Sequence, residues 1–213
     1  MIRHFLARKS IITVTLAILV AAGCAETAPT RFYTLSKVDA PAAVPARAAE
    51  SRLAVGVGPV SLPQYLDRPQ VVRRAGPNRF ELAGFDSWGE PLEDMFARVV
   101  AQNVSTLLGT DRVFVIPRRR LPELDYQVEV EVLRFDADVG GNAFLVARWE
   151  IFDGEGKQLR LEQTTLSEPV AEPVEGESYE PVIAAMSATL AAFSRQLTQA
   201  IQSMPPDRSF PGS

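Results

Sequence analysis

Apolar and polar residues alternate with a period of two through the middle of the chain. Over residues 126–132 every second side chain is apolar, with glutamine or glutamate between, a pattern that predicts a strand with one buried face. After Leu133 the alternation changes phase. Because a shift of one residue turns every side chain to the other face, we expect a β-bulge or sharp twist near Leu133. Residues 143–151 and 158–168, each preceded by a glycine-containing turn, complete a predicted three-stranded meander.

Two segments, residues 87–109 and 181–202, instead carry apolar residues every three or four positions. This spacing predicts amphipathic helices that pack on a core. Ser87 and Glu90 have the spacing of a capping box, and Gly109 suits the position just past the last helical turn. Ser178 or Tyr179 is expected to begin the second helix.

Shorter runs predict the remaining strands. Residues 53–60 and 112–116 flank the first helix and predict a parallel crossover, which should be right-handed. Residues 71–74 and 79–82 predict a hairpin, and the aromatic residues 31–35 predict a short strand that docks on the domain. This order indicates an α/β or α+β fold, with one mostly antiparallel or mixed sheet and two long helices.

The N-terminus has the organisation of a lipoprotein signal peptide. Basic residues, a short apolar run and small residues follow one another up to Gly23, as in secretory signals. Residues 19–24 resemble the bacterial lipobox, with Ala21 where leucine is usual. This resemblance implies cleavage before Cys24, a diacylglyceryl group on its sulfur and an acyl chain on its freed amine. The alternatives are a short membrane anchor and an unmodified cysteine.

These features divide the chain into four parts. Residues 1–23 are the predicted signal peptide, and residues 24–50 are an alanine- and proline-rich tether that contains the docking strand. Residues 51–202 are the predicted folded domain, and residues 203–213 are a loose tail. Cleavage removes three basic residues from a chain of net charge −4, which leaves −7. Such an acidic protein is a poor candidate for binding nucleic acid, and we expect its membrane attachment to come from the acyl chains.

Composition excludes most enzyme classes. The one histidine, His4, and the one cysteine, Cys24, both precede the folded domain. That domain therefore has no Ser-His-Asp or Cys-His apparatus, no disulfide and no zinc site with His or Cys ligands. Two carboxylate pairs, Glu129 with Glu131 and Asp136 with Asp138, are each spaced to lie on one face of a strand, where a solvent-facing role is simpler than glycosidase chemistry. We expect no enzyme activity, no metal and no cofactor other than the acyl groups on Cys24.

Residues 59–69 predict a stiff loop, because three prolines fix its backbone. Tyr65, Leu66, Asp67 and Arg68 lie on this loop and are candidate partner-binding residues, since interfaces favour Tyr and Arg. The alternative is that Tyr65 packs inward and Asp67 pairs with Arg68. Trp88, at the start of the first helix, is either a plug over the core or a further partner contact.

Several segments together resemble one family. Arg31-Phe32-Tyr33-Thr34-Leu35, the stretch Gly58-Pro-Val-Ser-Leu-Pro-Gln-Tyr-Leu-Asp-Arg-Pro-Gln70, Trp88-Gly89-Glu90-Pro91-Leu92 and the last amphipathic helix are similar to the PqiC/YmbA family of ABC-type transport auxiliary lipoproteins. The resemblance implies a single three-layer mixed α/β domain and a non-enzymatic envelope lipoprotein. It also implies MCE-domain tunnel proteins as partners, sorting to the outer membrane, a role in membrane integrity and a homo-oligomeric ring.

Two other functions stay open at this stage. A lipid-carrying module would need an apolar cavity between sheet and helices large enough for an acyl chain. A glycan hydrolase would need a cleft with a carboxyl group of raised pKa.

Overall fold

The computed structural model describes residues 29–38, 53–117, 122–171 and 178–204. The predicted signal peptide, Cys24, most of the tether and nearly all of the tail lie outside these residues. The helices and strands of the described residues belong to one compact unit that begins at Arg31. In order they are β1 (Arg31–Tyr33), β2 (Val55–Ser61), a 3-10 turn (Gln64–Leu66), β3 (Gln70–Gly76), β4 (Arg79–Trp88), α2 (Leu92–Leu108), β5 (Val113–Val115), β6 (Tyr126–Asp138), β7 (Asn142–Asp153), β8 (Gln158–Pro169) and α3 (Glu180–Gln202).

The eight strands form one mixed sheet organised around β6. One edge of β6 pairs with β2 along its first half and with β3 near its end, both in parallel. Its other edge pairs with β7 antiparallel, and β7 pairs with β8 in the same sense. β5 joins β2 in parallel across α2, as the predicted crossover requires, and β1 joins β4 in parallel as the predicted docking strand.

The predicted bulge is confirmed at Leu133. The register between β6 and β7 shifts between Val132 and Arg134, opposite Ala147 and Val146. The side chain of Leu133 is exposed, whereas Val132 and Phe135 on either side of the shift are buried. After the bulge, the side chains of β6 that face the core are therefore not those that unbroken alternation from the first half of the strand would place there.

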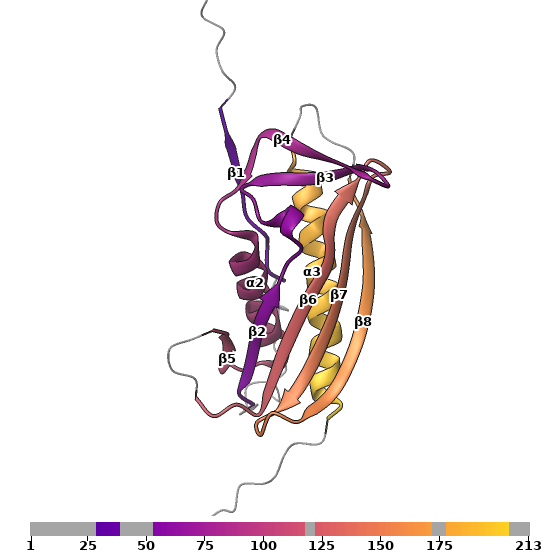
Figure 1. The fold of residues 1–213 in the computed structure, drawn as a ribbon. Helices are drawn as coiled ribbons and strands as arrows, with labels where there is room; N and C mark the ends of the chain where they lie inside the picture. The colour runs from indigo at the N-terminus through magenta and orange to yellow at the C-terminus, as the bar shows by residue number, and fades with distance from the viewer. Residues whose placement is uncertain (1–28, 39–52, 118–121, 172–177, 205–213) are drawn as a thin grey trace, which may run out of the picture. The chain divides into compact units, whose positions relative to one another are not determined.

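Both helices pack on the same face of the sheet (Figure 1). α2 contacts β2, β5 and α3, and α3 contacts β6, β7 and β8. The ring of Phe96 in α2 meets those of Phe135 in β6 and Phe193 in α3, at centroid distances of 5.4 and 6.3 Å.

The predicted mixed sheet with two long helices is confirmed. The described residues form a helix layer on a sheet layer, where we expected three layers. None of the described helices is long and apolar enough to cross a membrane.

The predicted start of the first helix is wrong. Ser87 is paired within β4, opposite Gln70 of β3, and α2 begins at Leu92 after Pro91 without a side-chain cap. Glu90 forms an ion pair with Arg98 instead of closing a capping box. Strand pairing with β1 and β3 holds this segment extended and so overrides the local capping signal. The other end is as predicted, because Gly109 ends α2 with a left-handed backbone, φ 66°.

Candidate functional site

The loop after β2 carries the candidate residues and is tied to the domain by its backbone. The amide of Leu66 donates a hydrogen bond to the carbonyl of Pro63 (2.9 Å), and the amide of Trp88 donates to the carbonyl of Pro69 (2.7 Å). The side chains of Leu66 and Trp88 are both buried in the core. Trp88 is therefore the plug over the core that was one of its two predicted roles.

Tyr65 packs against the sheet. Its hydroxyl donates to Oδ2 of Asp136 at 2.9 Å, and its ring stacks on that of Phe80 at a centroid distance of 4.4 Å. Asp67 and Arg68 are exposed, and no ion pair joins them among the residues that the structure describes. Tyr65 thus holds the loop in place and leaves Asp67 and Arg68 to face solvent.

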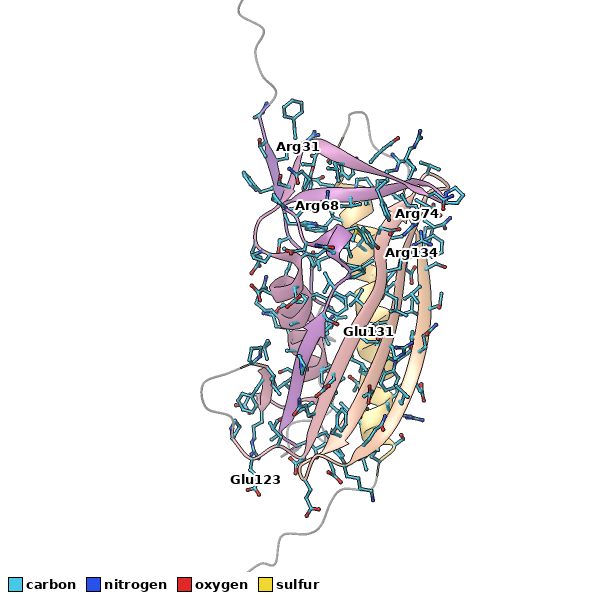
Figure 2. All side chains as sticks on the ribbon, in the orientation of Figure 1. Arg31, Arg68, Arg74, Glu123, Glu131 and Arg134 are labelled. Carbon is cyan, nitrogen blue, oxygen red and sulfur yellow. The ribbon has the colours of Figure 1, made fainter. Side chains whose placement is uncertain are left out.

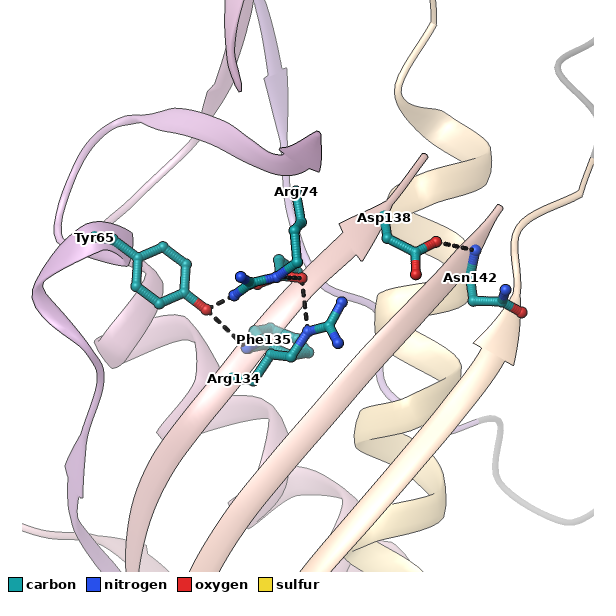
Figure 3. Close-up of polar contacts among 7 residues, drawn as sticks. Tyr65, Arg74, Arg134, Phe135, Asp138 and Asn142 are labelled. Carbon is teal, nitrogen blue, oxygen red and sulfur yellow. Dashed lines mark hydrogen bonds and ion pairs between the residues drawn. The ribbon is translucent and has the colours of Figure 1, made fainter. Parts of the chain in front are cut away.

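The expected solvent-facing role of Asp136 is wrong, because Asp136 is a fully buried carboxylate at the centre of a polar cluster. Figure 3 labels Tyr65, Arg74 and Arg134 of this cluster. Besides the Tyr65 hydroxyl, it accepts hydrogen bonds from Nη2 of Arg74 at 3.1 Å and from Nε of Arg134 at 2.9 Å. Arg134 also lies over the ring of Phe144 at 3.9 Å. Two guanidinium groups and a phenol replace the water that a buried carboxylate loses, which is the condition for keeping such a charge inside a protein.

High pH should destabilise the protein through Tyr65. Burial, followed by the charge of Asp136, raises the pKa of Tyr65 from 10.0 to about 12. Between these values the unfolded chain loses the phenol proton and the folded chain keeps it, so stability falls as pH rises. Allowing for solvent screening at the partly exposed ring, the loss is about 1–2 kcal/mol.

Urea unfolding of the wild type and Tyr65→Phe at pH 9 and pH 11 measures this loss. The variant should lose less stability than the wild type over that interval. Equal losses would show that Tyr65 is not the group responsible.

A cleft of about 580 Å³ lies beside this loop, between it and the start of α2. Its lining residues are Leu62, Gln64, Leu66, Asp67, Arg68, Pro69, Trp88, Glu90, Pro91, Leu92 and Glu93. Its accessible apolar surface comes from Leu62, Pro69 and Pro91, which line it together with the buried side chains of Leu66, Trp88 and Leu92. The exposed charges are three acidic residues and Arg68. We call this the docking cleft. An apolar centre with a charged rim is the usual anatomy of a protein interface.

Four of the five predicted site residues meet in the docking cleft, namely Leu66, Asp67, Arg68 and Trp88. The fifth, Tyr65, positions the loop from outside. Sequence reasoning missed Glu93 as a lining residue and Asp136 as the anchor of the loop. The position of Glu93 in the second turn of the predicted helix could have pointed to it, but nothing local indicates that Asp136 binds Tyr65, which lies 71 residues earlier.

A second cavity, of about 650 Å³, lies at the junction of β4 with the start of α3. Its walls include Arg31, Arg73, Leu82, Phe85 and Tyr179. No three His, Cys, Asp or Glu side chains gather as metal ligands in the ranges that the structure describes.

Comparisons with known proteins agree with this fold. A crystal structure of an uncharacterized protein aligns with a TM-score of 0.65 at 16% identity, covering 82% of this chain and 99% of that one. A DUF330-family protein from Xanthomonas campestris aligns with a TM-score of 0.64 at 19% identity, covering 82% and 100%. PelC from Paraburkholderia phytofirmans, crystallised as a dodecamer, aligns at 13% identity over 78% and 95% of the two chains. Its TM-score of 0.40 supports no inference about this protein.

The family is shown by a sequence model rather than by these structures. No curated protein matches the chain. The model of the ABC-type transport auxiliary lipoprotein component matches residues 33–198, from β1 to the last turns of α3. This match includes the loop, the docking cleft and both helices. The chain therefore belongs to the family of ABC-type transport auxiliary lipoprotein components.

Proposed function

We propose that this protein is a lipid-anchored, non-enzymatic auxiliary subunit of an MCE/ABC-type transenvelope lipid transport system. Acyl groups on Cys24 hold it at the outer membrane, where it docks the periplasmic tunnel protein and supports membrane integrity. Family membership supports the transport role and the lipoprotein character. The MCE-domain partner, the outer membrane and assembly into a homo-oligomeric ring follow from the sequence resemblance and are parts of the proposal.

The docking cleft is the observation that carries this proposal. Its loop is held by prolines and by the partly buried Tyr65–Asp136 hydrogen bond, so little conformational entropy is lost when a partner binds. Three acidic side chains and one arginine surround the apolar surface of this cleft, and one of the acids, Glu90, is already paired with Arg98. The partner that fits is a protein segment that inserts an apolar side chain and presents basic residues to Asp67 and Glu93.

A lipid carrier with an acyl pocket is the second candidate function. The space between the helices and the sheet is filled by fully buried side chains such as Phe96, Leu145 and Phe193. What favours the carrier is the 650 Å³ cavity at the start of α3, because Leu82 and Phe85 on its wall are apolar and exposed.

Affinity purification from the native host separates the two functions. Full-length protein extracted in mild detergent should recover an MCE-domain protein at near-stoichiometric yield, identified by mass spectrometry. Cys24→Ala should leave the membrane fraction. A lone lipoprotein that carries phospholipid would contradict the docking role and favour the carrier.

Charge reversal in the docking cleft should weaken recovery of the partner. Because Glu93 is exposed and its replacement leaves the core intact, Glu93→Lys should lower the yield of the MCE-domain protein about tenfold or more, the effect of ~1.4 kcal/mol. Glu131→Lys, which reverses an equally exposed charge on the middle of β6, is the matched control and should bind as the wild type does. Equal yields from both variants would place the interface elsewhere.

A further inference from the structure

Exposed apolar side chains gather at one end of the domain. Among the described residues, eight large apolar side chains are exposed, and five of them, Phe32, Phe80, Leu82, Phe85 and Val139, lie on β1, β4 and the turn after β6. These elements are neighbours, because β1 pairs with β4, β4 with β3, and β3 with the end of β6. Single exposed apolar residues need no explanation, but a group on adjacent elements marks a surface that contacts something apolar.

Three of these residues, Phe32, Leu82 and Phe85, are exposed on the neighbouring strands β1 and β4. Phe32 is 70% exposed and Phe85 is 44% exposed, and Leu82 lines the same cavity as Phe85. Phe32 and Phe85 come from strands that run side by side, since Phe32 pairs with Ser87, two residues after Phe85. We call Phe32, Leu82 and Phe85 the apolar patch.

The length of chain before β1 determines what this patch can meet. Arg31 follows Cys24 by seven residues, and at most ~3.6 Å per residue these span about 25 Å in any conformation. By contrast, the 13 residues of β6 extend about 43 Å at ~3.3 Å per residue. An acyl group on Cys24 therefore keeps β1 and the neighbouring strands within about 25 Å of the lipid. Glu123, which precedes the first residue of β6 and lies at the opposite end of the domain (Figure 2), can be farther from the lipid than this.

The charges at this end do not oppose contact with a lipid surface. Arg31, Arg73, Arg74 and Arg79 lie on β1, β3 and β4, and Figure 2 shows Arg31 and Arg74 at the end away from Glu123. The acidic residues on these three strands are Glu81 and Asp86. Three of these arginines already have carboxylate partners, since Arg31 pairs with Asp86, Arg74 with Asp136 and Arg79 with Glu81. The charges on the strands that carry the apolar patch are therefore largely balanced, so these strands, unlike the acidic chain as a whole, do not repel phosphate headgroups.

We propose that the apolar patch lies against the boundary between headgroups and acyl chains of the membrane that anchors Cys24. The patch adds apolar contact to the acyl anchor and fixes the orientation of the domain on the membrane, so that the docking cleft is presented in one direction. A surface is held in this way when exposed apolar side chains such as Phe32 and Phe85 enter the interface. The inference rests on the lipidation of Cys24 in the proposed function.

Site-specific fluorescence on the full-length lipidated protein tests this orientation. Because Cys24 is the sole cysteine and its sulfur carries the diacylglyceryl group in the lipidated protein, an engineered cysteine is the single free thiol. Phe32→Cys and Phe85→Cys are labelled with an environment-sensitive dye and reconstituted into phosphatidylethanolamine–phosphatidylglycerol vesicles that contain spin-labelled lipid. Leu161→Cys is the control, since Leu161 is 54% exposed but lies on β8 opposite Glu150.

Quenching by the spin-labelled lipid should be about threefold or more stronger at positions 32 and 85 than at position 161. Equal quenching at all three would overturn the proposal. A blue-shifted dye at position 32 without lipid quenching would also overturn it and assign the patch to a second copy or another protein. Leu82→Cys replaces either variant that fails to fold by circular dichroism.

Intact-mass spectrometry of the same samples keeps the two proposals distinct. A mass without acyl groups would refute the anchor, and this orientation with it. An acylated protein whose dye is not quenched would refute the orientation and leave the anchor and the docking role standing.

Discussion

Asp136→Asn should lower the free energy of unfolding by about 3 kcal/mol, as expected when one partner of a buried ion pair is removed. The substitution keeps the shape of the side chain but takes away its charge. Arg74 and Arg134, whose side chains are each 23% exposed, would then face each other without a counter-charge. The Tyr65 hydroxyl would also lose its charged acceptor, so the loop of the docking cleft should loosen with the sheet.

Urea unfolding followed by circular dichroism measures this effect. Glu131→Gln is the matched control, because it removes the same charge from the same strand at an exposed ion pair with Arg148. The control should change stability by less than about 1 kcal/mol. Similar losses from the two variants would mean that the Asp136 cluster does not hold the loop.

Gly58→Ala should destabilise the protein by about 3 kcal/mol, combining backbone strain with overpacking. Gly58 has φ +125°, a region that residues with a Cβ rarely adopt, and a Cβ there would come within 2.3 Å of the Ile116 carbonyl oxygen. The register between β2 and β6 shifts just after this residue, between Val57 and Val60. The glycine therefore allows the bend that leads β2 into the loop of the docking cleft.

Gly84→Ala is the control for this second variant. Gly84 lies in β4, its φ is not in the positive region, and a Cβ there would meet nothing within 4 Å. We expect its stability to change by less than about 0.5 kcal/mol. The midpoint of thermal unfolding is measured for both variants and should be clearly lower for Gly58→Ala. Equal midpoints would show that the structure beside Ile116 can relax to accept a Cβ at position 58.

Local sequence patterns were sufficient to predict those features that depend on a single helix or strand. The alternation of β6 and its change of phase located the bulge at Leu133, and the apolar spacing of α3 located that helix to within one residue. Gly109 ended α2 as its freedom at positive φ predicts. Each of these features depends on contacts between near neighbours along the chain and on which face is buried.

The start of α2 shows where such reasoning fails. Ser87 and Glu90 have the capping spacing, but the backbone of this segment is extended by pairing with β1 and β3. The β1 partner of Ser87, Phe32, lies 55 residues away in the sequence. A capping interaction of about 1 kcal/mol cannot compete with a strand paired on both sides.

The sequence by itself determined the fold class, the family resemblance and four of the residues that line the docking cleft. Only the tertiary structure decided which of them face solvent, because burying Leu66 and Trp88 requires the loop, β4 and α2 to meet. It also decided that Asp136 holds Tyr65 from 71 residues away and that the exposed side chains Phe32, Leu82 and Phe85 share one end. Such groupings depend on strand pairing between distant segments, which leaves no periodic signal within either segment.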